Sequence, residues 1–189
     1  YANMLTVAEI DGAERITTFV TFDVDDLDAA VAELDSRYLA GEAAAYARTW
    51  SVIAKAYAGY NRHELPATTT DPAYIDHRSI VGVEGAELAA SLSAVLELVP
   101  DAHVCIGTVH RLNELGAVVT QVVQGSSPEG LYIESSTIAV FTFEGDLISR
   151  AEIFDESDLD AALARFDELS RPTPQLENAA SRANGRFIA

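Results

Sequence analysis

The chain has 189 residues, and 49% of them are hydrophobic, which is enough apolar surface for one packed domain with additional segments. Thirty acidic and 12 basic residues give a net charge of −18, which repels phosphate backbones and anionic lipids. This charge argues against nucleic-acid and membrane partners, and the single cysteine excludes an intrachain disulfide and a cysteine-based zinc cluster.

The first predicted elements are two strands, residues 4–10 and 15–22, on either side of an Asp11–Gly12 turn. A helix is expected next, with Asp23 as a candidate N-cap. Its apolar residues recur at the spacing of one helical face, at Leu27, Ala30, Val31 and Leu34.

The same pattern returns near the other end of the chain. The segment FDVDDLDAAVAELD begins at Phe22 and FDESDLDAALARFD begins at Phe154, and 9 of the 14 aligned positions are identical. Asp155 is the corresponding candidate N-cap. Self-similarity over this distance is typical of repeated whole domains. We therefore expect residues 1–35 to be the tail of a preceding module, 36–170 a complete module, and 171–189 a linker or the start of the next module.

The hairpin in residues 1–22 is expected to need a partner, because an isolated two-stranded hairpin is marginal in water. We expect it to pair with an edge of the sheet formed by residues 103–154, or with a second copy of the chain.

The complete module begins with a helix over residues 44–61, in which Tyr46, Trp50, Ile53 and Tyr57 share one face. The segment 73–78 is a short extended piece, and residues 85–98 form a second helix that Pro100 ends. Period-two patterns then predict four sequential strands. Their connections are too short for parallel crossovers, so an antiparallel order is expected for 103–112, 117–124, 131–143 and 147–154.

This order of elements, with the segment Asp76–His77–Arg78 after the first helix, resembles the nuclear-transport-factor-2/SnoaL-like superfamily. The resemblance implies an α+β fold in which a curved antiparallel sheet packs on N-terminal helices and leaves a conical pocket. The repeated FDxxDLDAAL ending is similar to that of SnoaL-like modules in large multidomain bacterial proteins. The resemblance also implies a homodimer that associates through the open face of the sheet.

Asp76 and His110 are the candidate catalytic residues, because a partly buried aspartate or a histidine in a cone pocket could each act as an acid–base group. In ketosteroid-isomerising members of the superfamily, an aspartate at a comparable place is the general base. Strand alternation places His77 on the opposite face from Asp76. The alternative is that Asp76 and Arg78 form a structural ion pair, and that His110, expected to share a face with Val104, Ile106, Thr108 and Leu112, is also structural.

Candidate ligand-binding residues are those that could roof or line the cone. The alternative for the aromatic ones is plain core packing. These residues are Trp50, Tyr57, Tyr60, His77, Arg78, Gln121 and Glu134.

Motifs for zinc hydrolysis, phosphate binding and nucleophilic serine or cysteine chemistry are absent from the sequence, so we expect no cofactor and no metal. The sequence favours a cytoplasmic, non-catalytic module that binds a small apolar molecule or mediates assembly with other modules of the same polypeptide. The alternative is a polyketide-cyclase- or isomerase-like enzyme that uses Asp76 or His110.

Overall fold

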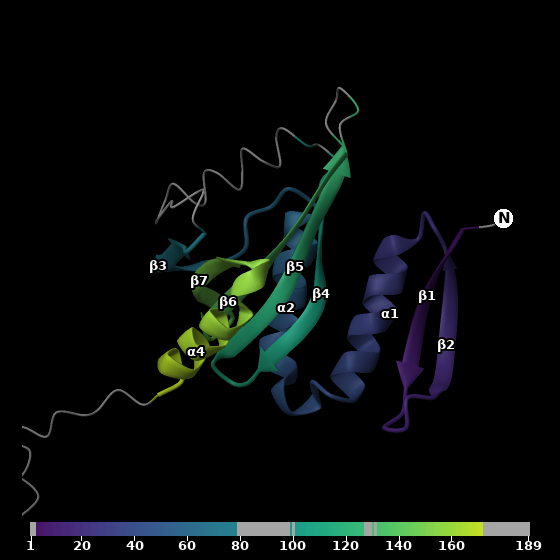
Figure 1. The fold of residues 1–189 in the computed structure, drawn as a ribbon, viewed down its shortest axis with the longest axis horizontal. Helices are drawn as coiled ribbons and strands as arrows, with labels where there is room; N and C mark the ends of the chain where they lie inside the picture. Colours follow the sequence, from purple (N-terminus) through teal and green to yellow (C-terminus); the bar gives the residue numbers. More distant parts are fainter. Residues whose placement is uncertain (1–2, 79–98, 100, 127–129, 131, 172–189) are drawn as a thin grey trace, which may run out of the picture.

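The computed structural model describes residues 3–78, 99, 101–126, 130 and 132–171, and the arrangement of its elements is shown in Figure 1. A two-stranded hairpin and a helix come first: β1 (Met4–Ile10), β2 (Ile16–Asp23) and α1 (Leu27–Ala40). A 3-10 turn (Ala44–Tyr46) leads into α2 (Ala47–Tyr60) and β3 (Thr68–Asp76). The remaining elements are β4 (His103–Leu112), β5 (Gly116–Ser126), β6 (Tyr132–Glu144), β7 (Leu147–Asp155), a 3-10 turn (Glu156–Asp158) and α4 (Leu159–Leu169).

Five strands form one sheet in the order β3-β7-β6-β5-β4. The strands from β4 to β7 are antiparallel neighbours in chain order, as their short connections predicted. The strand β3 lies parallel to β7 at one edge of the sheet, and β4, the next strand in the sequence, lies at the opposite edge. The helix expected over residues 85–98 lies outside the described residues.

Two glycines make the tight turns of this sheet possible. A Cβ atom on Gly116 would lie 1.8 Å from the carbonyl oxygen of Phe141, so only glycine fits at the start of β5. Gly145, in the turn between β6 and β7, has a φ of +65°, which L-residues with side chains rarely adopt.

The sheet has a helix on each face, and alternate residues of β6 show how. Ala139 and Phe141 join the core around α2, whereas Ile138 and Val140 pack with Phe166 of α4. The curved sheet thus encloses α2 on one side and carries α4 on the other. The expected α+β class, a cone-shaped sheet packed on a helix that precedes it, is confirmed.

The helix starts were predicted one turn too early. The N-cap positions are Asp26 and Asp158 rather than Asp23 and Asp155, and neither makes a side-chain capping hydrogen bond. In the first copy, the amide of Asp26 donates to the carbonyl of Asp23, which closes a turn before the helix begins. In the second, residues 156–158 form the 3-10 turn.

The hairpin does not extend the larger sheet. In the part of the chain that the structure describes, β1 and β2 form a separate two-stranded sheet, so the expected pairing with an edge of residues 103–154 is wrong for this structure. The hairpin packs on α1, which lies between it and the rest of the molecule (Figure 1). α1 continues to Ala40, so the module boundary expected at residue 35 falls inside a helix.

Candidate functional site

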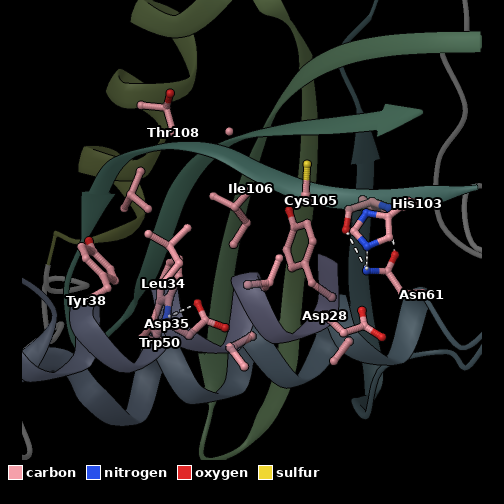
Figure 2. A pocket seen from close by; sticks show the side chains of 18 of the residues that line it. Asp28, Leu34, Asp35, Tyr38, Trp50, Asn61, His103, Cys105, Ile106 and Thr108 are labelled. Carbon is pink, nitrogen blue, oxygen red and sulfur yellow. Dashed lines mark hydrogen bonds between the residues drawn. The ribbon is translucent and has the colours of Figure 1, made fainter. Parts of the chain in front are cut away.

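A groove of about 640 Å³ lies between α1, α2 and the edge strand β4 (Figure 2). Ile106 of β4 points towards the helices that form its floor, whereas Cys105 and Thr108 point away from them (Figure 2). Most of its lining is apolar or aromatic, which is the composition of small-molecule sites. This part of the lining includes Val31, Leu34, Trp50, Ala54, Ile106 and Val109.

Asp35 and Trp50 join α1 to α2 at the groove. The indole Nε1 of Trp50 donates to Oδ1 of Asp35 over 3.0 Å, and the ring of Tyr38 meets that of Trp50 edge-on at 4.6 Å between centroids. Burial raises the pKa of the Asp35 carboxyl group, against the smaller lowering effect of the indole hydrogen bond. The groove therefore contains a half-buried carboxyl group whose ionised form is disfavoured.

Asn61 and His103 meet at the C-terminal end of α2. The Asn61 amide pairs with both backbone groups of Val104: its Oδ1 accepts from the Val104 amide at 2.8 Å, and its Nδ2 donates to the Val104 carbonyl at 3.1 Å. These two contacts fix the orientation of the amide. Nδ2 also lies 3.2 Å from Nε2 of His103, which must accept, so the neutral imidazole carries its proton on Nδ1. That nitrogen is buried and has no partner among the described residues.

Tyr57 connects α2 to the concave face of the sheet. Its hydroxyl donates to Oε1 of Gln121 at 3.0 Å, and Nε2 of Gln121 donates to Thr137 at 3.1 Å. Burial raises the pKa of Tyr57 well above its usual value, and burial likewise raises that of Tyr60, whose ring lies edge-on to Tyr57. Both phenols are therefore neutral hydrogen-bonding groups, and the structure brings Tyr57 and Gln121 together.

Asp76 is held by a neighbour two residues away. Arg78 donates to both oxygens of the Asp76 carboxylate, with Nη2 at 2.7 Å from Oδ2 and Nε at 3.0 Å from Oδ1. The Asp76 side chain is fully buried. Burial would raise its pKa, but the hydrogen bonds and charge of Arg78 outweigh burial and lower it. The structural ion pair considered for these two residues is present.

His77 faces the other side of the sheet from Asp76, as strand alternation predicted. Its ring stacks on Phe154 at 4.1 Å, and its Nε2 lies 2.7 Å from Oε2 of Glu152. Glu152 is completely buried and also binds Arg150 and Arg165. Burial would raise its pKa, but these partners lower it. This cluster attaches α4 to the sheet.

His110 does not share a face with Val104, Ile106 and Leu112. The β4–β5 register shifts between Ile106 and Thr108 and again between Val109 and Arg111. Each β-bulge adds a residue and reverses the alternation. His110 consequently contacts the hydroxyl of Thr120, through Nε2 at 2.7 Å, on the side opposite to Val119 and Gln121.

Of the predicted ligand-binding residues, Trp50 and Tyr57 line the groove. Gln121 binds Tyr57 without lining the groove, and Tyr60 packs against the core around α2. Arg78 and His77 make the contacts described above and do not line it. Glu134 is exposed and accepts from the Tyr132 hydroxyl at 3.0 Å, away from the groove lining. The sequence reasoning missed Asp35, Asn61 and His103. Asn61 and His103 are 42 residues apart, so no local spacing could have paired them.

Comparisons with known proteins add resemblance in fold only. No protein-family model matches the chain, and no curated protein matches it. Among solved structures, a putative hydroxylase, AclR, from Streptomyces galilaeus has 13% identity over 72% of this chain and 92% of its own, with a TM-score of 0.47. A putative SnoaL-like polyketide cyclase from Jannaschia sp. CCS1 has 18% identity over 66% and 94%, with a TM-score of 0.45. An NTF2-like protein of unknown function from Burkholderia pseudomallei has 14% identity over 61% and 96%, with a TM-score of 0.46.

The described residues include no helix of sufficient length and apolarity to cross a membrane. They also include no group of three or more histidine, cysteine, aspartate or glutamate side chains placed to hold a metal ion.

Proposed function

We propose that this domain binds a small, mostly apolar molecule in the groove between α1, α2 and β4, without catalysing a reaction on it. The observation that carries the proposal is the lining of the groove. Its walls are largely apolar and aromatic, and a few polar groups, among them Asp35, Asn61 and His103, stand at defined places among them. This combination binds an apolar body and orients it.

The candidate acid–base residues form contacts with other side chains outside the groove, which supports binding rather than catalysis. A catalytic site needs at least two convergent titratable groups within reach of one reacting atom. Asp76 is paired with Arg78, His77 with Glu152, and His110 lies on the far side of β4, next to Thr120. None of the three lines the groove.

The polar groups suggest the chemistry of the ligand. The buried Nδ1–H of His103 lacks an acceptor among the described residues, and an unsatisfied buried donor is costly. A side-chain motion that brings this donor to the groove wall would let the carbonyl oxygen of a ligand accept from it and remove that cost. The net charge of −18 disfavours anions. We therefore propose a neutral, flat or compact apolar molecule that carries a carbonyl group.

Binding can be measured with Nile red, a neutral apolar fluorophore, followed by displacement with 9-fluorenone and with fluorene, which lacks the carbonyl oxygen. We expect Nile red to bind, and fluorenone to displace it at a lower concentration than fluorene. In the variant His103→Phe, the difference between the two competitors should disappear, because the donor is gone.

The groove itself is tested with a matched pair of variants on α2. Ala58 lines the groove, whereas Ser51 is exposed on the same helix outside it. Ala58→Phe should weaken Nile red binding at least tenfold, and Ser51→Phe should leave it unchanged. Equal binding by both variants would show that the dye binds elsewhere and would remove the proposal.

A further inference from the structure

The β1–β2 hairpin has one covered face and one open face. Leu5, Val7, Val20 and Phe22 are half-buried on the side of α1. The opposite face is apolar and open to solvent: Met4, Ile10, Ile16 and Phe19 are each between 61% and 66% exposed. Ile10 and Ile16 pair with each other and lie next to the Ala8–Phe19 pair, so these residues form one exposed apolar patch, which marks an interaction surface. Met4 lies at the other end of the face, beyond Thr6 and Thr21.

The register of this hairpin repeats that of β6–β7 pair by pair. Met4 pairs with Asp23 as Thr137 pairs with Asp155, and Leu5 pairs with Phe22 as Ile138 pairs with Phe154. Both hairpins also shift register at the same place, between Glu9 and Ile10 in one and between Thr142 and Phe143 in the other. The repetition seen in the sequence therefore extends to backbone pairing, including the irregularity.

The helix after each hairpin packs on the same face. α4 covers the face of β6–β7 that carries Ile138, Val140 and Phe154. α1 takes the corresponding position on Leu5, Val7 and Phe22. The open face of β1–β2 therefore corresponds to the concave face of β6–β7, which α2 covers in the complete domain.

The residues of the two corresponding faces make this comparison specific. Ile10, Ile16 and Phe19 align with Phe143, Ile148 and Ala151, and all three of the latter belong to the core around α2. The outer edges of the two hairpins also differ in whether they are covered. β6 and β7 are flanked by β5 and β3, whereas β1 and β2 have no further strand neighbours among the described residues.

We propose that β1, β2 and α1 are the last elements of a second cone-shaped domain, and that their open face binds the front part of that domain. The occupant is a helix like α2 with an aromatic and apolar face, together with strands like β3 and β5, supplied by polypeptide upstream of this chain. A second copy of the chain is a poorer occupant, because its own β6–β7 already covers its α2 and pairs with its β3 and β5.

The test lengthens the full chain with its own sequence. A copy of residues 36–135 is placed directly before Asn3, which preserves the spacing between β5-like and β6-like elements. Hydrogen exchange is then measured by mass spectrometry over residues 3–23 in the original and the lengthened chain. We expect exchange in the hairpin to slow at least tenfold in the lengthened chain, because its open face and edges become covered.

The double variant Ile16→Thr/Phe19→Thr serves as the control. Threonine keeps a high strand propensity but removes the apolar face. In the lengthened chain this variant should lose most of the added protection, whereas in the original chain it should leave the melting midpoint unchanged. Because α2, β3 and β5 pack against or pair with β6–β7 in this chain, a lengthened chain with no added protection in the hairpin would overturn the proposal.

Light scattering tests the remaining possible occupant of the open face, which is a second copy of the chain. The original chain and its double variant are expected to have the same mass at all concentrations. If the mass of the original chain falls by half on introduction of the two threonines, the open face is an interface between copies, and the proposal is wrong.

Discussion

Asp35 connects a titratable carboxyl group directly to the only tryptophan of the chain. Burial raises the pKa of Asp35 above its ordinary value of 3.8. The neutral form therefore persists to higher pH than in the unfolded chain. We expect the emission of Trp50 to change on acidification with a midpoint above 3.8, since the charge on its hydrogen-bond acceptor is removed. Asp35→Asn keeps an acceptor without a charge and should abolish this transition.

A fluorescence transition that survives in Asp35→Asn would assign the change to another group or to unfolding. Circular dichroism recorded over the same pH range distinguishes these, because titration of one carboxyl group leaves the secondary structure intact.

Asp76 provides the contrasting case, since its pKa is lowered by Arg78 despite burial. A carboxylate with a lowered folded-state pKa stabilises the fold above its unfolded pKa of about 3.9, and this contribution is lost as pH falls through the folded value. Asp76→Asn leaves Arg78 without its partner and should cost about 3 kcal/mol of unfolding free energy at pH 7. The difference from the wild type should shrink at pH 3, as measured by urea denaturation.

An unchanged free energy of unfolding in Asp76→Asn would contradict a structural role for the pair. Unchanged stability together with loss of ligand turnover would favour the alternative in which Asp76 acts as an acid–base group in an enzyme.

At the scale of elements, the two hairpin–helix units offer a comparison within one chain. Phe166 of α4 is 1% exposed and packs on Val118 and Val140, whereas Leu34, its counterpart in α1, is 51% exposed. Phe166→Ala should cost about 3–5 kcal/mol, because it leaves a cavity between helix and sheet. Leu34→Ala should cost less than about 1 kcal/mol. Chemical denaturation of both variants measures the two costs.

Equal costs for the two substitutions would mean that α1 is packed as tightly as α4 in solution. In that case Leu34 would be covered in solution rather than exposed in the groove.

The strands themselves follow from residue patterns, but their faces do not always do so. Alternation correctly separates Asp76 from His77, because β3 is regular over these residues. It fails for His110, because the first of two bulges in β4, between Ile106 and Thr108, reverses the alternation ahead of His110. The isolated Gly107 inside this strand is a sequence signal for the first bulge, and the prediction of strict alternation did not take it into account.

At the scale of the whole molecule, the larger sheet is independent of the hairpin in its hydrogen bonding. Deletion of residues 3–23 should therefore leave the five-stranded sheet folded. α1 loses one packed face and the ion pair between Arg37 and Glu9, but keeps the bond between Asp35 and Trp50. We expect a cooperative transition whose melting midpoint changes by only a few degrees, measured by circular dichroism.

Loss of cooperative unfolding in the truncated chain would show that the hairpin is part of the same folding unit as the five-stranded sheet. Light scattering of the same two proteins also tests the homodimer implied by the resemblance. If the chain dimerises through the open face of the larger sheet, the measured mass should be twice the mass of one chain both before and after truncation.

The sequence by itself determined the order of the described elements, the antiparallel succession from β4 to β7 and the repeated hairpin–helix unit. These features depend on local periodicity, turn residues and connection lengths, which are properties of neighbouring residues. Only the tertiary structure decided which polar groups meet. Trp50 of α2 binds Asp35 of α1, and Asn61 contacts His103, which is 42 residues later in the chain. These segments come together through the curvature of the sheet and the packing of α1. Such contacts depend on how whole elements pack against one another, and no local pattern carries that information.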